Sequence, residues 1–100
     1  MAQPHELSTY SVEGTRQVAS ATTVVQLGLR NLSRRSLTIY NDSTAVLYVR
    51  FGDTVSSTNY KFQVASNSFY EMPTDMLYTG VISGTWAAAN GFAYVAEGSD

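Results

Sequence analysis

The stretch RRSLTIYNDSTAVLYVRFG, residues 34–52, decides the fold class of this 100-residue chain. Leu37 and Ile39 fall on one side of an extended backbone in its first half. Leu47 and Val49 do the same in its second half. Such two-residue alternation is typical of β-strands with one buried face. The intervening NDST favours a turn because Asn and Asp bond their own backbone. We therefore predict a β-hairpin whose apolar faces coincide.

The same alternation continues along most of the chain, and helical periodicity is missing from the sequence pattern. Further strands are predicted at residues 22–30, 60–65, 68–72, 78–87 and 92–96. Asn90-Gly91 is a strong hairpin signal and predicts a second tight turn. About seven short strands separated by turn residues indicate an all-β fold. We expect a small antiparallel β-sandwich, and a jelly-roll-like topology is one form that it could take.

The chain divides into two parts by pattern. Residues 1–21 alternate weakly and contain Pro4 and Gly14, so we interpret them as an extended N-terminal arm. Residues 22–100 form the predicted sandwich domain. Neither a charged leader nor an apolar run opens the sequence, so a secretory signal is not expected. A window of roughly 20 apolar residues, as needed to span a bilayer, is also not found.

Composition points to a protein that works within an assembly. Charged residues make up 14% of the chain, against about 25% in typical soluble proteins. The net charge is only −2, and the chain has no cysteine. A surface short of charge is poorly protected against association. Many small β-proteins rich in Ser and Thr have a similar composition, so this feature alone does not decide the function.

Residues suited to catalysis, cofactor binding or metal binding are scarce. The single histidine, His5, lies in the predicted arm beside Pro4 and has no evident partner to orient it. Most carboxylates fall in predicted turns or near the termini, where capping and turn chemistry place them. With one histidine and no cysteine, a zinc site would need a carboxylate-heavy ligand set that zinc rarely uses. We predict no catalytic, cofactor-binding or metal-binding residue.

Surface contacts are the remaining functional signal. The candidate partner-interface residues are Arg30, Arg34, Arg35, Tyr40, Tyr48 and Arg50. The first three cluster at the start of the predicted hairpin, and the others point away from its apolar face. Binding to nucleic acid is disfavoured because the sequence pI is about 5.2 and phosphate binding needs a broad positive surface. We therefore expect contacts with protein, and we expect Trp86 to be buried.

Three segments carry a resemblance to a known family. RRSLTIYNDSTAVLYVRFG, SFYEMP and LYTGVISGTWAAANGFAYV, in this order, resemble small structural proteins of tailed bacteriophages. The resemblance covers about residues 22–97 and includes no catalytic residue. It implies a β-sandwich that binds a virion surface, as head decoration or cement proteins do. Nothing carries over to the residues that precede it.

The resemblance and the composition together predict a non-enzymatic virion protein. We expect it to bind the major capsid protein or other virion subunits and to clamp neighbouring capsid subunits. A homo-oligomer is expected, a trimer before a dimer, assembled in the host cytoplasm, with no membrane or direct nucleic-acid contact. The arm would add a strand to a neighbour's sheet. The alternatives are a tail, neck or fibre component, and a carbohydrate-binding module that uses Trp86 and outward tyrosines.

Overall fold

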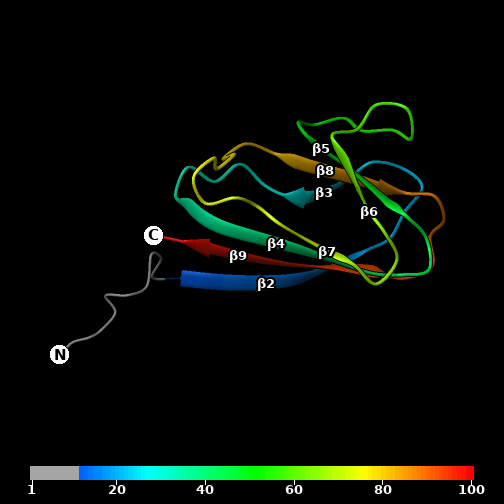
Figure 1. The fold of residues 1–100 in the computed structure, drawn as a ribbon, viewed down its shortest axis with the longest axis horizontal. Helices are drawn as coiled ribbons and strands as arrows, with labels where there is room; N and C mark the ends of the chain where they lie inside the picture. Colours follow the sequence, from blue (N-terminus) through cyan, green and yellow to red (C-terminus); the bar gives the residue numbers. More distant parts are fainter. Residues whose placement is uncertain (1–11) are drawn as a thin grey trace.

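The computed structural model describes residues 12–100, which form two antiparallel four-stranded sheets packed face to face (Figure 1). The lower sheet in Figure 1 consists, in spatial order, of β2 (Val12–Ala19), β9 (Phe92–Ser99), β4 (Arg34–Asp42) and β7 (Phe69–Glu71). The upper sheet consists of β3 (Val25–Gly28), β8 (Ile82–Trp86), β5 (Leu47–Phe51) and β6 (Phe62–Val64). The predicted all-β sandwich is confirmed, with eight strands in the described residues where about seven were expected.

The order of strand pairing is that of a jelly roll. The first described strand pairs with the last, β2 with β9, and the second pairs with the second to last, β3 with β8. The third pairs with the third to last, β4 with β7, and the two middle strands, β5 and β6, pair with each other. A long hairpin wrapped over itself gives this arrangement. The jelly-roll form of the predicted sandwich is therefore the one that the chain adopts.

Both predicted hairpins are wrong. β4 and β5 lie in different sheets, and so do β8 and β9, so the NDST and Asn90-Gly91 segments each carry the chain from one sheet to the other. Alternation determines which face of a strand is buried, but it does not determine the neighbouring strand. Two consecutive strands can bury the same apolar faces by opposing each other across the core. In this chain they do so at both connections.

The two crossing connections pack against each other at one end of the sandwich. The side-chain oxygen Oδ1 of Asn90 accepts a hydrogen bond from the backbone N–H of Thr44 at 3.2 Å. A Cβ atom on Gly91 would overlap the carbonyl oxygen of Asp42 and the Cβ of Ser43. Glycine at position 91 therefore serves close approach of two backbones and not a tight hairpin turn.

The core lies between the sheets and is built from the alternating inward positions of their strands. Its buried apolar residues are Leu27, Leu37, Ile39, Ala45, Leu47, Val49, Val64, Met72, Ile82, Trp86, Ala93 and Val95. The expected burial of Trp86 is confirmed, since this residue is only 2% exposed.

The predicted boundary between arm and domain is wrong for residues 12–19. β2 pairs with β9 along all eight of its residues, from Val12 opposite Ser99 to Ala19 opposite Phe92. The strand therefore extends the sheet of its own chain, whereas the sequence predicted that it would extend a neighbour's. Its pattern is weak because an edge strand buries little of its surface. The rest of the predicted arm, residues 1–11, lies outside the described residues.

One buried polar side chain joins the two sheets at the end of the sandwich where the NDST and Asn90-Gly91 connections lie. Asn41, at the end of β4, is 0% exposed, and its Nδ2 donates to the carbonyl oxygens of Ala45 at 2.8 Å and Val64 at 2.9 Å. Its Oδ1 accepts from Ser43 Oγ at 2.8 Å and from Trp86 Nε1 at 3.0 Å. Asn41 thus connects β4 to β6, to β8 and to the start of β5.

Replacing Asn41 is expected to destabilise the protein strongly. The Asn41→Ala variant would remove the partner of the Trp86 indole N–H and the side-chain donor to the Val64 carbonyl oxygen, and would leave the Ala45 carbonyl oxygen with the Ser43 hydroxyl alone, at a cost of roughly 3 kcal/mol. Asn59→Ala is the matched control because Asn59 is exposed, and its change should stay within about 0.5 kcal/mol. Urea unfolding followed by Trp86 fluorescence measures both. Equal midpoints for the two variants would contradict the structural role of Asn41.

Candidate functional site

Four exposed aromatic side chains lie on the outer side of the sheet β2-β9-β4-β7. They are Tyr40, Phe69, Phe92 and Tyr94, with exposed fractions of 36%, 65%, 39% and 43%. We call this surface the aromatic face. Monomeric proteins rarely leave several large apolar side chains exposed together, and such patches mark interaction sites. The aromatic face is therefore the candidate functional site.

Strand register brings these side chains together. Tyr40 on β4 lies opposite Tyr94 on β9 and opposite Phe69 on β7. Gln17 on β2 lies opposite Tyr94, and its Nε2 donates to the Tyr94 hydroxyl at 2.9 Å. Neighbouring strands are about 4.8 Å apart, so this row of four residues spans roughly 14 Å across the sheet. Phe92 points to the same side as Tyr94 because it lies two residues away on β9.

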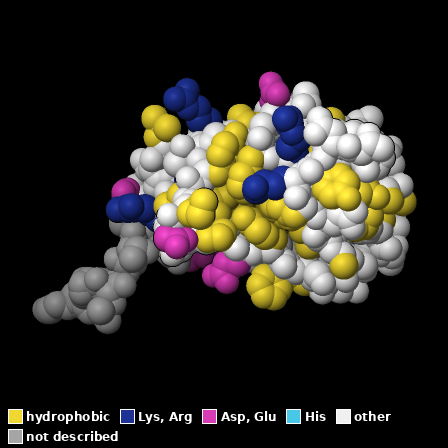
Figure 2. Space-filling model, turned by 45° about the horizontal axis from the view of Figure 1, so that its top comes forward, with side chains coloured by type: hydrophobic (Ala, Val, Ile, Leu, Met, Phe, Trp, Pro, Cys, Tyr) yellow, Lys and Arg dark blue, Asp and Glu magenta, His cyan; other side chains and the backbone are white. Residues whose placement is uncertain are grey.

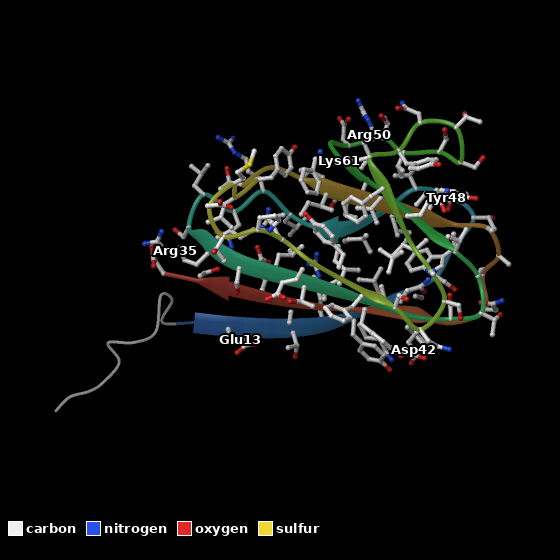
Figure 3. All side chains as sticks on the ribbon, viewed as in Figure 1. Glu13, Arg35, Asp42, Tyr48, Arg50 and Lys61 are labelled. Carbon is white, nitrogen blue, oxygen red and sulfur yellow. The ribbon has the colours of Figure 1, made fainter. Side chains whose placement is uncertain are left out.

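Carboxylates border the aromatic face. Asp42 lies opposite Phe92 and Glu71 lies opposite Thr38, both in register with outward positions. Glu13 lies further along the same outer side, opposite Gly98. Figure 3 shows Glu13 and Asp42 along the lower sheet, whereas Arg50 and Lys61 lie at the opposite layer. An acidic border repels phosphate groups, so this surface suits a protein partner better than a nucleic acid.

The double arginine of the sequence separates into two different roles. Arg34 is 1% exposed, and its Nε donates to Glu97 Oε2 at 2.6 Å. Its two terminal nitrogens donate to the carbonyl oxygens of Tyr78 at 2.6 Å and Leu29 at 2.7 Å. The prediction that Arg34 contacts a partner is therefore wrong, because its guanidinium is fully enclosed. Arg34 connects the β3–β4 and β7–β8 loops, which also cross between the sheets, to β9.

The other predicted contact residues do not form one surface. Arg35 is exposed at the end of β4 and pairs with Asp100 at 3.0 Å, and Arg30 is exposed in the connection between β3 and β4. Tyr48 and Arg50 lie on the outer side of the upper sheet, at the other side of the core from Tyr40. Of the predicted candidates, the aromatic face contains Tyr40 alone.

Sequence reasoning missed Phe69, Phe92 and Tyr94. Phe92 and Tyr94 alternate with the buried Ala93 and Val95, so their outward direction could have been recognised from the pattern. Their position beside Tyr40 could not, because it depends on the pairing of β9 with β4, two strands that are far apart in the sequence.

A second aromatic group closes one open side of the sandwich. Phe51 stacks on Tyr78 with ring centroids 4.6 Å apart, and Phe62 stacks on Tyr70 at 4.1 Å. The Lys61 ammonium lies 5.4 Å from the Phe51 ring centroid. Burial raises the pKa of the Tyr70 phenol. Figure 2 shows hydrophobic side chains gathered in the middle of its face, with Lys and Arg side chains beside them. These four rings cover one another, so they complete the core and offer less free surface than the aromatic face.

Metal-binding clusters and membrane-spanning helices are both missing from residues 12–100. No group of three or more His, Cys, Asp or Glu side chains there is arranged to hold a metal ion. Among these same residues, no helix is long and apolar enough to cross a membrane.

Comparisons with known proteins add no relative to this description. No protein-family model, curated protein or solved structure matches the chain.

The two adjacent arginines are expected to differ sharply in their effect on stability. Arg34→Met removes the cation beside Glu97, which keeps only the Asn31 amide as a donor, and removes the side-chain donor to three carbonyl oxygens, which should cost about 3 kcal/mol or more. Arg35→Met removes an ion pair whose side chains are 48% and 57% exposed, and should cost at most about 0.5 kcal/mol. Chemical denaturation of both variants measures the difference. Similar losses for the two would show that Arg34 is not the structural residue.

Proposed function

We propose that this protein is a non-enzymatic structural protein of a virion, most simply a head decoration protein of a tailed phage, which attaches to the shell through its aromatic face. The observation that carries the proposal is the row of exposed aromatic side chains across β9, β4 and β7. Aromatic residues supply large contact areas and are enriched among the residues that dominate binding energy at interfaces.

The chemistry of the face defines the partner surface that it fits. Tyr40, Phe69 and Tyr94 would enter apolar pockets of the shell, and the Tyr hydroxyls would find polar partners at the rim. Asp42 and Glu71 at the border favour basic groups on the partner. The proposed partner is therefore the major capsid protein, or another virion subunit, with an apolar patch ringed by Lys or Arg.

The fold is compatible with this role but does not decide it. Jelly rolls occur in viral capsid proteins, and also in lectins and other binding proteins. Fold-level analogy alone cannot assign a function. The resemblance of residues 22–97 to phage structural proteins adds a second, independent reason for placing the protein in a virion.

The proposal includes a homo-oligomer, a trimer in preference to a dimer, because closed symmetry matches local axes of a capsid. Donation of a strand to a neighbour can no longer involve residues 12–19, which pair with β9 in their own chain.

A tail, neck or fibre component is the second form of the same proposal. Copy number distinguishes them, since a ring or spike needs few copies and a decorated head needs hundreds.

Co-sedimentation with heads that lack the protein tests the proposal directly. Purified protein is mixed with heads of its source phage from which this chain has been removed, and the bound amount is measured over a concentration series. Saturable binding on the order of hundreds of copies per head is expected from the symmetry of a decorated shell. Saturation at a few copies would assign the protein to the neck or tail, and absence of binding both to these heads and to tails that lack the chain would contradict a structural role.

A double variant tests the contact surface. Tyr40→Ser with Phe69→Ser removes two exposed rings, and the apparent Kd for heads should rise by about 30-fold, the equivalent of one interface hot spot of about 2 kcal/mol. Met76→Ser is the matched control because Met76 is 77% exposed and lies outside the aromatic face. Wild-type affinity in the double variant would show that binding uses another surface.

A further inference from the structure

The upper sheet carries a depression on its outer side, at the other side of the core from the aromatic face. Its volume is about 540 Å³, within the range of small-ligand sites. The connection between β2 and β3 forms one wall through Thr22, Thr23 and Val24, and the loop after β5 forms the other. We call it the hydroxyl groove, for the chemistry of its lining.

Six of the ten lining residues carry a hydroxyl group, the other four are apolar, and charged side chains are not part of the lining. The hydroxyl-bearing residues are Thr22, Thr23, Tyr48, Ser56, Ser57 and Thr85. A hydroxyl both donates and accepts hydrogen bonds. A lining of this kind matches a ligand that is itself rich in hydroxyls, and it offers neither the cations that a phosphate needs nor the carboxylates that a metal ion needs.

Backbone contacts hold the walls of the hydroxyl groove in place. The backbone N–H of Trp86 donates to the carbonyl oxygen of Ala21 at 2.8 Å, which fixes the wall that leads into β3. Ser56 and Asn59 exchange two backbone hydrogen bonds of 3.0 and 3.2 Å, which close the opposite loop. Ser83 Oγ donates to the Gly52 carbonyl oxygen at 2.6 Å and attaches the start of that loop to the sheet. A site held in this way loses little entropy on binding.

The floor of the hydroxyl groove combines the Tyr48 ring with the Thr85 hydroxyl, which can still form further hydrogen bonds. Thr85 lies opposite Tyr48 in the register of β8 and β5, so both point outward. Thr85 Oγ1 makes only a long contact of 3.4 Å to the Ala21 carbonyl oxygen. The half-buried Tyr48 ring, 5.1 Å from the Tyr60 ring, offers an electron-rich face to weakly positive C–H groups.

We propose that the hydroxyl groove binds an uncharged saccharide, with Tyr48 against the C–H face of a sugar ring and the wall hydroxyls bonded to its hydroxyls. This site is separate from the aromatic face, and its occupancy does not depend on attachment to a head. It also changes the role that Trp86 has in the carbohydrate-binding alternative. That residue is too deeply buried to be a stacking platform, and Tyr48 takes this position.

The single tryptophan provides a reporter close to the hydroxyl groove, because Trp86 contributes to its lining while its indole packs in the core beneath. The full chain is titrated with maltohexaose, cellohexaose, mannohexaose and chitohexaose while Trp86 emission is recorded. Saturation-transfer NMR on the same mixtures detects any binding that leaves the emission unchanged. At least one of the four neutral sugars is expected to bind saturably and to shift the emission. Binding of none by either method, or binding of heparin alone, would overturn the proposal.

Two variants locate the binding. Tyr48→Leu removes the ring, and Ser57→Phe places a bulky ring in the hydroxyl groove from an exposed wall position. Each should weaken saccharide binding about tenfold or more, equivalent to about 1.4 kcal/mol. Thr38→Val on the lower sheet is the control and should bind like the wild type. If both groove variants keep wild-type affinity, the sugar binds elsewhere and the assignment of this site is wrong.

Discussion

The buried side-chain amide of Asn41 is the constraint on which the jelly roll depends. At this end of the sandwich four connections pass from one sheet to the other, so several carbonyl groups leave their ladders inside the protein. Buried carbonyl oxygens need donors, and water is excluded from this position. An asparagine supplies two N–H donors and one carbonyl acceptor from a single small group. It therefore bonds the Ala45 and Val64 carbonyls and the Trp86 indole at once, which no apolar residue could do.

At the other end of the same strand, Arg34 supplies hydrogen-bond donors to the carbonyl oxygens of the loops there. Arg34 and Asn41 are seven positions apart, roughly 23 Å along β4, and Leu37 and Ile39 lie between them in the core. A register irregularity between Arg34 and Ser36 turns Arg34 inward and leaves Arg35 in solvent. One strand thus carries a polar anchor at each end and apolar contacts in its middle. This explains why neighbouring arginines have unrelated roles.

The sequence pattern was sufficient for the buried faces but not for the pairing of strands. Leu37, Ile39, Leu47 and Val49 are all buried as their alternation predicts. Asn41 continues the parity of Leu37 and Ile39, so its inward direction could have been recognised as a buried polar residue in need of partners. The hairpin prediction failed because a hairpin and a crossing between sheets bury the same alternate residues. The irregularity beside Arg34 has no signal in the sequence.

Only Tyr40 of the aromatic face was predicted. Phe69, Phe92 and Tyr94 lie beside it because β4 pairs with β7 and β9, strands that are far from it in the sequence.

The two outer surfaces of the sandwich differ in chemistry because different strands build them. Large aromatic rings bordered by carboxylates are exposed on β9, β4 and β7. On β5 and β8, hydroxyl groups and one tyrosine ring lie between two loops that hydrogen bonds hold in place. A core about 10 Å thick separates the two. If the aromatic face lies on a shell, the hydroxyl groove faces outward, where a decoration protein would meet the surroundings of the particle. A substitution on one surface touches no side chain on the other, so loss of head binding and loss of saccharide binding should occur independently.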